Sequence, residues 1–149
     1  MNNLQLKILN IFREFKNGVG HVLNPQSLNS KISQWDRRSQ DESQTAIENL
    51  VTEGFISYDG SHFILNQSGY DKIWEGYTLQ DTENFILNIY RERNLGIGHG
   101  LHPAALNGIR NNAERFHMDN MGTAWQSLVD KGYLNENGQL QQTGYDKIY

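Results

Sequence analysis

The chain of 149 residues contains no cysteine and only 2 prolines. The absence of cysteine excludes a disulfide framework, a thiolate zinc site and a cysteine nucleophile. No apolar run approaches the ~18 residues that a membrane span needs, and the first residues lack the pattern of a signal peptide. We therefore expect a cytoplasmic protein that does not contact membranes. Hydrophobic residues make up 37% of the chain, enough for a folded core. The net charge of −4 disfavours indiscriminate binding to nucleic acid.

The chain contains an internal repeat. Residues 8–29 align without gaps on residues 86–107, with 13 of 22 positions identical. At the same offset of 78, residues 45–56 align on residues 123–134, and the sequence GYDKI occurs at 69–73 and again at 144–148. Both prolines, Pro25 and Pro103, fall on equivalent positions. Because the order is preserved throughout, we predict two domains, 1–76 and 77–149, that arose by duplication.

Each copy carries the signals of three helices followed by a β-hairpin. Apolar residues recur at helical spacing over residues 4–15, and a proline then opens a second predicted helix, Pro25–Trp35. The third predicted helix is Asp41–Glu53, ended by a glycine. The pairs Asp59-Gly60 and Asn137-Gly138 are strong hairpin signals. The fold class is thus mainly α with small β-hairpins (α+β). The predicted core consists of Ile8, Phe12, Leu28, Ile47, Leu50 and Phe55, with their counterparts Ile86, Tyr90, Leu106, Trp125, Leu128 and Tyr133.

Residues 50–73, LVTEGFISYDGSHFILNQSGYDKI, resemble a stretch of bacterial winged-helix transcription regulators. There a leucine of the third helix, a glycine, a two-stranded wing and an L-x-x-x-G turn follow one another. Residues 128–148, LVDKGYLNENGQLQQTGYDKI, are similar with a shorter wing. The resemblance implies two tandem winged-helix domains and a DNA-binding regulator, whose third helix enters the major groove of double-stranded DNA. Because the same fold also serves in protein–protein interaction, a scaffold module is the alternative.

The two copies differ most over residues 30–44 and 108–122, the part that faces DNA in winged-helix regulators. Arginine contacts phosphate, and asparagine and glutamine read base edges. The resemblance therefore implies DNA contacts in the first copy by Arg37, Arg38, Gln40, Ser43 and Gln44, and in the second by Arg110, Asn111, Asn112, Arg115, His117, Asn120 and Gln126. Carboxylates in the first copy oppose phosphate. We expect the second copy to read DNA better, with a protein partner as the alternative for the acidic first copy.

Two histidines, His21 and His99, repeat within G-x-G-H-x-L-x-P, and His102 follows the second of them. Their spacing suits a metal site on a helix better than one in a turn, and the first copy has Asn24 in place of His102. We predict that these histidines serve the turn geometry and bind no metal. No Ser/His/Asp pattern or close carboxylate pair repeats between the copies. We therefore expect neither catalytic residues nor a cofactor, and a protein that is not an enzyme.

Overall fold

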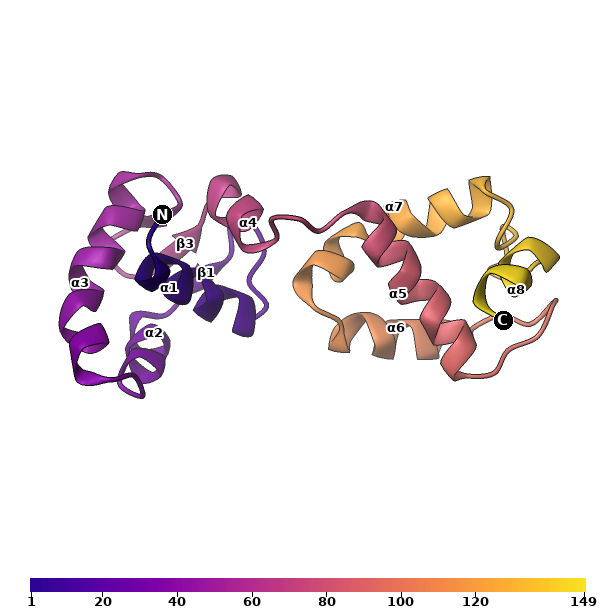
Figure 1. The fold of residues 1–149 in the computed structure, drawn as a ribbon, viewed down its shortest axis with the longest axis horizontal. Coiled ribbons are helices and arrows are strands. Elements are labelled where there is room, and N and C mark those ends of the chain that lie inside the picture. Colours follow the sequence, from indigo (N-terminus) through magenta and orange to yellow (C-terminus); the bar gives the residue numbers. More distant parts are fainter. The chain divides into compact units, whose positions relative to one another are not determined.

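The computed structural model describes residues 1–149 and contains eight helices and one three-stranded antiparallel sheet. The predominance of helices with a small amount of strand agrees with the predicted α+β class. The chain divides into two compact units, Met1–Glu75 and Gly76–Tyr149, called unit 1 and unit 2 below (Figure 1). None of the helices combines the length and the apolar character that crossing a membrane requires.

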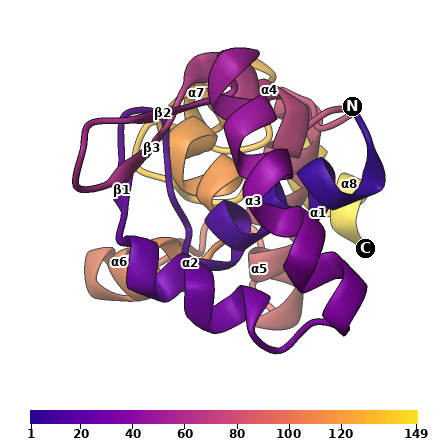
Figure 2. The ribbon, with the colours of Figure 1, turned by 90° about the vertical axis from the view of Figure 1, so that its left-hand side faces the viewer.

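Unit 1 packs helices against a three-stranded sheet whose central strand is β3 (Figure 2). Both neighbouring strands run antiparallel to β3, with Val22 opposite Ile64 and Tyr58 opposite Phe63. The hairpin between β2 and β3 turns at Asp59 and at Gly60, whose φ is +93°, as the sequence predicts. The elements in chain order are α1 (Asn3–Glu14), β1 (Val22–Leu23), α2 (Pro25–Ile32), α3 (Arg37–Thr52), β2 (Ile56–Tyr58), β3 (Phe63–Leu65) and α4 (Gln67–Ile73).

Unit 2 repeats this order of helices with less β structure. Its helices are α5 (Leu79–Glu92), α6 (Pro103–Asn112), α7 (Arg115–Asp130) and α8 (Gln142–Ile148). The second predicted hairpin is reduced to one bridge between Leu134 and Leu140, with Gly138 at positive φ in the turn. The segment from the glycine that ends α7 to the glycine of GYDKI is three residues shorter than in unit 1, since 144 − 132 = 12 and 69 − 54 = 15. The shorter segment of unit 2 therefore has too few residues to form a longer β-ladder.

Helix boundaries follow local chemistry. Both prolines stand at the first position of α2 and α6, where the missing N–H is tolerated. The residue before each proline caps the helix. Asn24 Oδ1 accepts a hydrogen bond from the backbone at 2.7 Å, and His102 Nδ1 accepts one at 3.1 Å. The predicted start of the third helix at Asp41 is wrong, because Asp36 accepts from the Ser39 N–H and starts α3 at Arg37.

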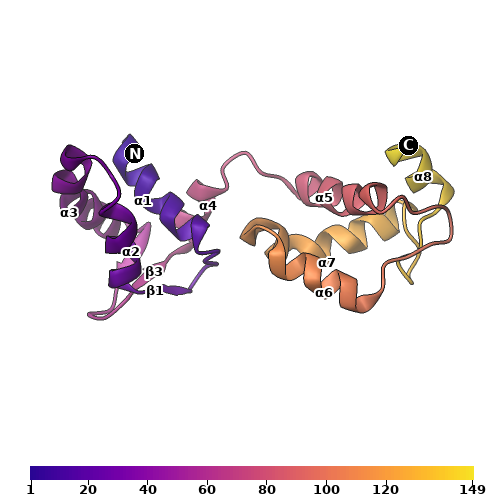
Figure 3. The ribbon, with the colours of Figure 1, turned by 90° about the horizontal axis from the view of Figure 1, so that it is seen from below.

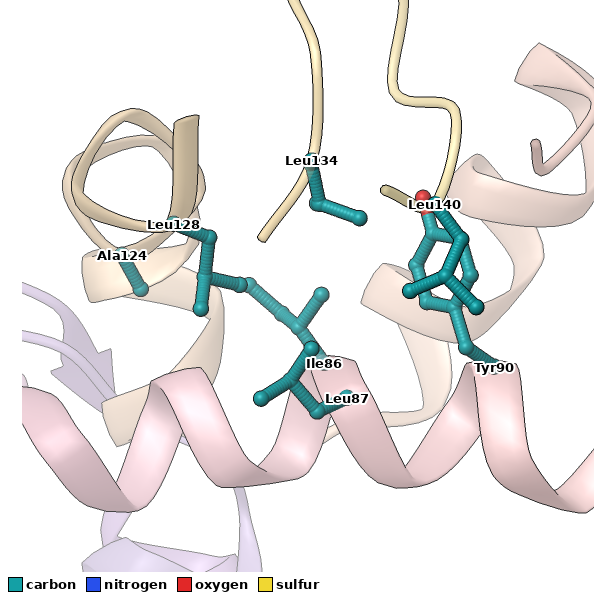
Figure 4. Close-up of a cluster of buried hydrophobic side chains, with 7 residues drawn as sticks. All are labelled: Ile86, Leu87, Tyr90, Ala124, Leu128, Leu134 and Leu140. Carbon is teal, nitrogen blue, oxygen red and sulfur yellow. The ribbon is translucent and has the colours of Figure 1, made fainter. Parts of the chain in front are cut away.

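The core of unit 2 lies between α5, α7 and the bridged segments. Figure 4 shows its cluster of side chains, which comprises Ile86, Leu87, Tyr90, Ala124, Leu128, Leu134 and Leu140. Eight of the twelve predicted core residues are buried, but Phe55, Tyr133, Leu106 and Trp125 are only half-buried. In place of Phe55 the following residue, Ile56, is buried in the core, and in place of Tyr133 it is Leu134. The buried position shifts by one residue because the chain turns at the glycine that ends the third helix.

Candidate functional site

The exposed face of α3 carries its arginines in ion pairs with its own carboxylates. Arg37 Nε lies 3.1 Å from Asp41 Oδ1, and Arg38 Nε donates to Glu42 Oε1 at 2.9 Å. The side chains of Arg37 and Arg38 are 84% and 87% exposed. The hydrogen bond to Glu42 and its negative charge raise the pKa of Arg38. With Glu48 exposed two turns beyond Asp41, the face has two cations and three carboxylates, and therefore no net positive charge.

The polar residues predicted to read bases from α3 are engaged within the unit. Gln40 Nε2 donates to the carbonyls of Trp35 at 2.7 Å and Ser33 at 3.3 Å, and so holds the turn between α2 and α3. Ser43, also predicted to contact DNA, is buried and donates to the Gln40 carbonyl at 2.7 Å. It falls on the same helical stripe as the core of α3. Gln44 stays exposed, and its amide donates to a carboxylate one turn on.

On α7 the predicted polar residues again bond along their own helix. Arg115 Nε donates to Asp119 Oδ1 at 2.8 Å, with the Arg115 side chain only 23% exposed. Asn120 donates to a backbone carbonyl of α7 at 2.8 Å, and Gln126 donates to Asp130 at 2.9 Å. Two carboxylates thus accompany the single arginine on the outer face of this helix. The balance of cations and carboxylates on this helix is thus similar to that of α3.

His117, also predicted to contact DNA, is half-buried and faces α5. Its Nδ1 hydrogen-bonds to Thr82 Oγ1 of α5 at 2.8 Å, and its ring stacks on Phe85 with centroids 4.6 Å apart. Burial lowers the pKa of His117 below its usual value, although Glu114 and Asp81 oppose the shift. The residue joins α7 to α5. Helical periodicity places it on the same side of α7 as the buried Ala124 and Leu128.

The three predicted contacts of α6 are exposed. Asn112 donates its amide to the Gly108 carbonyl at 2.9 Å, within the same helix, whereas Asn111 projects from the surface. Arg110 is the one of the four proposed phosphate-binding arginines that forms no ion pair within the chain. No carboxylate of the chain therefore competes with an external anion for the Arg110 guanidinium.

Unit 1 has a groove that sequence reasoning missed. It lies between the β2–β3 hairpin and α3 and has a volume of about 470 Å³. Tyr58, which is 51% exposed, and Phe63 pack with ring centroids 4.9 Å apart on the hairpin side. Ile47 and Val51 line the α3 side, and Glu48 stands among them. The signal in the sequence was the pair of aromatic residues, Tyr58 and Phe63, on either side of Asp59-Gly60.

Most cations of unit 1 are engaged within the unit. Lys7 lies over the Trp35 ring and Arg13 over the Trp74 ring, at 4.4 and 4.3 Å from the ring centroids. Six of the seven lysines and arginines of this unit contact a carboxylate or an aromatic ring, namely Lys7, Arg13, Lys31, Arg37, Arg38 and Lys72. Only Lys16 has no such contact, so nearly every cation of unit 1 already has a partner within the unit.

The repeated histidines serve their turns. His21 Nδ1 accepts from the Gly18 N–H and His99 Nδ1 from the Gly96 N–H, each at 3.1 Å. No group of three or more His, Asp and Glu side chains is placed to hold a metal ion. No protein-family model matches the chain, and comparisons with curated proteins and with solved structures give no significant match.

Proposed function

We propose that the chain is a pair of winged-helix domains related by duplication. Support comes from equivalent backbone bonds in the two units as well as from the shared order of helices. In unit 1 the Gly20 N–H donates to the Leu65 carbonyl at 2.8 Å, and in unit 2 the Gly98 N–H donates to the Leu140 carbonyl at 2.8 Å. These bonds join the turn after the first helix to the hairpin. The hairpin of each unit corresponds to the wing of a winged-helix domain.

We further propose that the protein is a non-enzymatic interaction module whose unit 1 binds a protein partner through the groove between α3 and the hairpin. This proposal depends on two properties of that surface, the ion pairing of its arginines and the apolar lining of the groove beside them. A winged helix that reads DNA needs cations on the third helix and wing. Here the arginines of α3 are paired with carboxylates, and the groove beside them is lined by Tyr58, Phe63 and Val51. Exposed apolar surface of this kind is typical of protein interaction sites.

The chemistry of the groove indicates the partner. An aliphatic or aromatic side chain fits between the hairpin and α3, where it removes apolar surface from water. Glu48 stands among the lining residues, and the unit carries 7 basic and 9 acidic residues, 7 − 9 = −2. A lysine or arginine next to the apolar side chain would therefore meet favourable charge. The expected ligand is a protein segment that combines the two.

Duplex DNA is the second candidate partner, and one observation favours it. Arg37 and Arg38 are more than four-fifths exposed at the first turn of α3, where phosphate contacts commonly form. Phosphate could replace Asp41 and Glu42 as their partner, because exposed intrahelical ion pairs stabilise a helix by only ~0.3–0.5 kcal/mol. In unit 2 the unpaired Arg110 would act in the same way.

A pair of binding measurements on the full chain separates the two candidates. Random peptides displayed on phage are selected against the chain, with a Val51→Glu variant as the counter-selection target. We expect enriched peptides to carry an apolar residue beside lysine or arginine, and to bind at least about tenfold more weakly to Val51→Glu. Val19→Glu, another exposed valine of unit 1 outside the groove, is the matched control and should bind normally. If no peptide distinguishes the chain from Val51→Glu, the groove is not the binding site.

The second measurement titrates fluorescent random-sequence duplex DNA at about 50 and 200 mM salt, where phosphate-driven binding falls steeply. We expect no binding at either concentration. Salt-dependent binding that weakens in an Arg37→Ala, Arg38→Ala variant, and tightens when Glu42 and Glu48 become glutamine, would replace the protein partner by DNA.

A further inference from the structure

Unit 2 contains a cavity of about 450 Å³ between α5, α6 and α7, the three helices drawn side by side in Figure 3. Its apolar lining includes Ile89, Leu101, Leu106, Ile109, Met121 and Trp125, and its polar lining includes Arg110. Pockets that bind small molecules have this size, about 300–1,000 Å³, and this balance of apolar walls with a few polar groups.

The inner part of the equivalent place in unit 1 is closed, and only its outer edge, at Asn29, Gln44 and Ile47, borders the groove beside the hairpin. At the offset of 78 residues, Leu101 and Leu106 correspond to Leu23 and Leu28, which are buried, whereas Leu101 and Leu106 are half-buried. Helix α6 has no buried residue at all, whereas α2 buries Leu28 and Ile32. Leucines at equivalent positions thus form a closed core in one unit and the wall of an opening in the other.

The substitution that opens the cavity also supplies its charge. Arg110 stands where unit 1 has the buried Ile32. A guanidinium is too costly to bury without a partner, so α6 cannot close onto α5 and α7 as α2 closes in unit 1. Asp119 also lines the cavity, but it pairs with Arg115 at 2.8 Å, and Arg110 has no carboxylate partner in the chain.

From these observations we propose that unit 2 binds a small apolar carboxylate, whose hydrocarbon part fills the cavity while its carboxylate pairs with Arg110. The hydrocarbon part would cover Leu101 and Leu106, whose counterparts Leu23 and Leu28 are buried within unit 1. At about 30 Å³ for each water-sized group, the cavity holds a ligand of about 15 non-hydrogen atoms. Arginine binds a carboxylate through two parallel N–H donors, so an acid is favoured over a neutral compound of the same shape.

The test uses 1-naphthoate, whose size matches the cavity, and the neutral isostere 1-naphthamide, both titrated into the full chain by calorimetry. Binding is located by NMR on chain labelled at the methionine methyl groups. The chain has 3 methionines, and two of them, Met118 and Met121, line the cavity, while Met1 lies in unit 1 as an internal reference. We expect 1-naphthoate to shift the signals of Met118 and Met121 alone, and to bind about tenfold more tightly than 1-naphthamide.

Variants test separately the pairing of the carboxylate with Arg110 and the apolar contacts of the hydrocarbon part. Arg110→Gln should bind the acid and the amide equally, whereas Leu106→Trp, which fills the cavity, should bind neither. Met121→Phe replaces Leu106→Trp if that variant does not give a cooperative thermal melt. Arg93→Gln, which removes an exposed arginine of unit 2 outside the cavity, should bind as the parent chain does.

Three outcomes would overturn the proposal. The first is the absence of ligand-induced shifts at Met118 and Met121, and the second is an unchanged preference for the acid in Arg110→Gln. The third is a dependence of both methionine signals on protein concentration without ligand, since the cavity would then be covered by a second copy of the chain.

Discussion

Two helical glycines of unit 2 are expected to respond oppositely to substitution by alanine. Replacing glycine by alanine inside a helix normally stabilises it by about 0.5–1 kcal/mol. At Gly122 in α7, an added Cβ meets nothing within 4 Å, so Gly122→Ala should realise this gain. At Gly144 in α8, the Cβ would overlap the Tyr133 carbonyl oxygen and lie 2.8 Å from Leu140 Cδ1. A backbone oxygen cannot move aside as a flexible side chain can.

Overpacking of this kind costs about 1–3 kcal/mol, which outweighs the helical gain at Gly144. We expect Gly144→Ala to lower the stability of unit 2, and its free energy of unfolding to lie about 1–3 kcal/mol below that of Gly122→Ala. Differential scanning calorimetry of the full chain measures the shift, about 4–8 °C for each kcal/mol in a unit of this size. Gly69→Ala should destabilise unit 1 similarly, because Gly69 faces the Phe55 carbonyl. Equal stabilisation by Gly144→Ala and Gly122→Ala would refute the reasoning.

Three further predictions concern the buried groups. Desolvation raises the pKa of Glu83, but hydrogen bonds from Ser127 and Lys131 outweigh it and hold the pKa below the ordinary 4.5. The stability from Glu83 is thus present above pH 4.5 and lost as pH falls through the lower folded value. Glu83→Gln should cost about 1–3 kcal/mol at neutral pH, since Lys131 is half-exposed, and should flatten the loss of stability in acid urea titrations. Burial raises the pKa of Tyr90 to about 12, so tyrosinate absorbance should include a late-titrating component, with stability falling as pH rises from 10 towards 12. Leu50→Ala and Leu128→Ala should each cost ~2–5 kcal/mol in denaturant unfolding, and an unchanged midpoint would show that the third helix of that unit does not pack as described.

Much of the local structure could be predicted because it depends on residues close together in the chain. The two prolines open helices because their φ and missing N–H suit a first turn. Gly54 and Gly132 end α3 and α7 at φ of +81° and +76°, a conformation that favours glycine. His21 accepts a hydrogen bond within its own turn.

The candidate site was predicted less well, because availability of a side chain depends on its neighbours in space. Ser43 and His117 have the chemistry of base-reading residues, but the start of each helix sets which face they occupy, and both turn inward. Arg37 and Arg115 are cations in the sequence, but each pairs with a carboxylate one helical turn on.

The sequence by itself determined the repeat, the order of helices and the turns, since these follow from periodicity and from backbone conformations that a few residues decide. Only the tertiary structure decided which surfaces are open. Leu28 and Leu106 occupy equivalent positions of the repeat, yet one is buried in a closed core and the other borders a cavity. Whether a leucine is buried depends on how closely two helices approach, and in unit 2 a cation four residues further along α6 keeps that approach from closing.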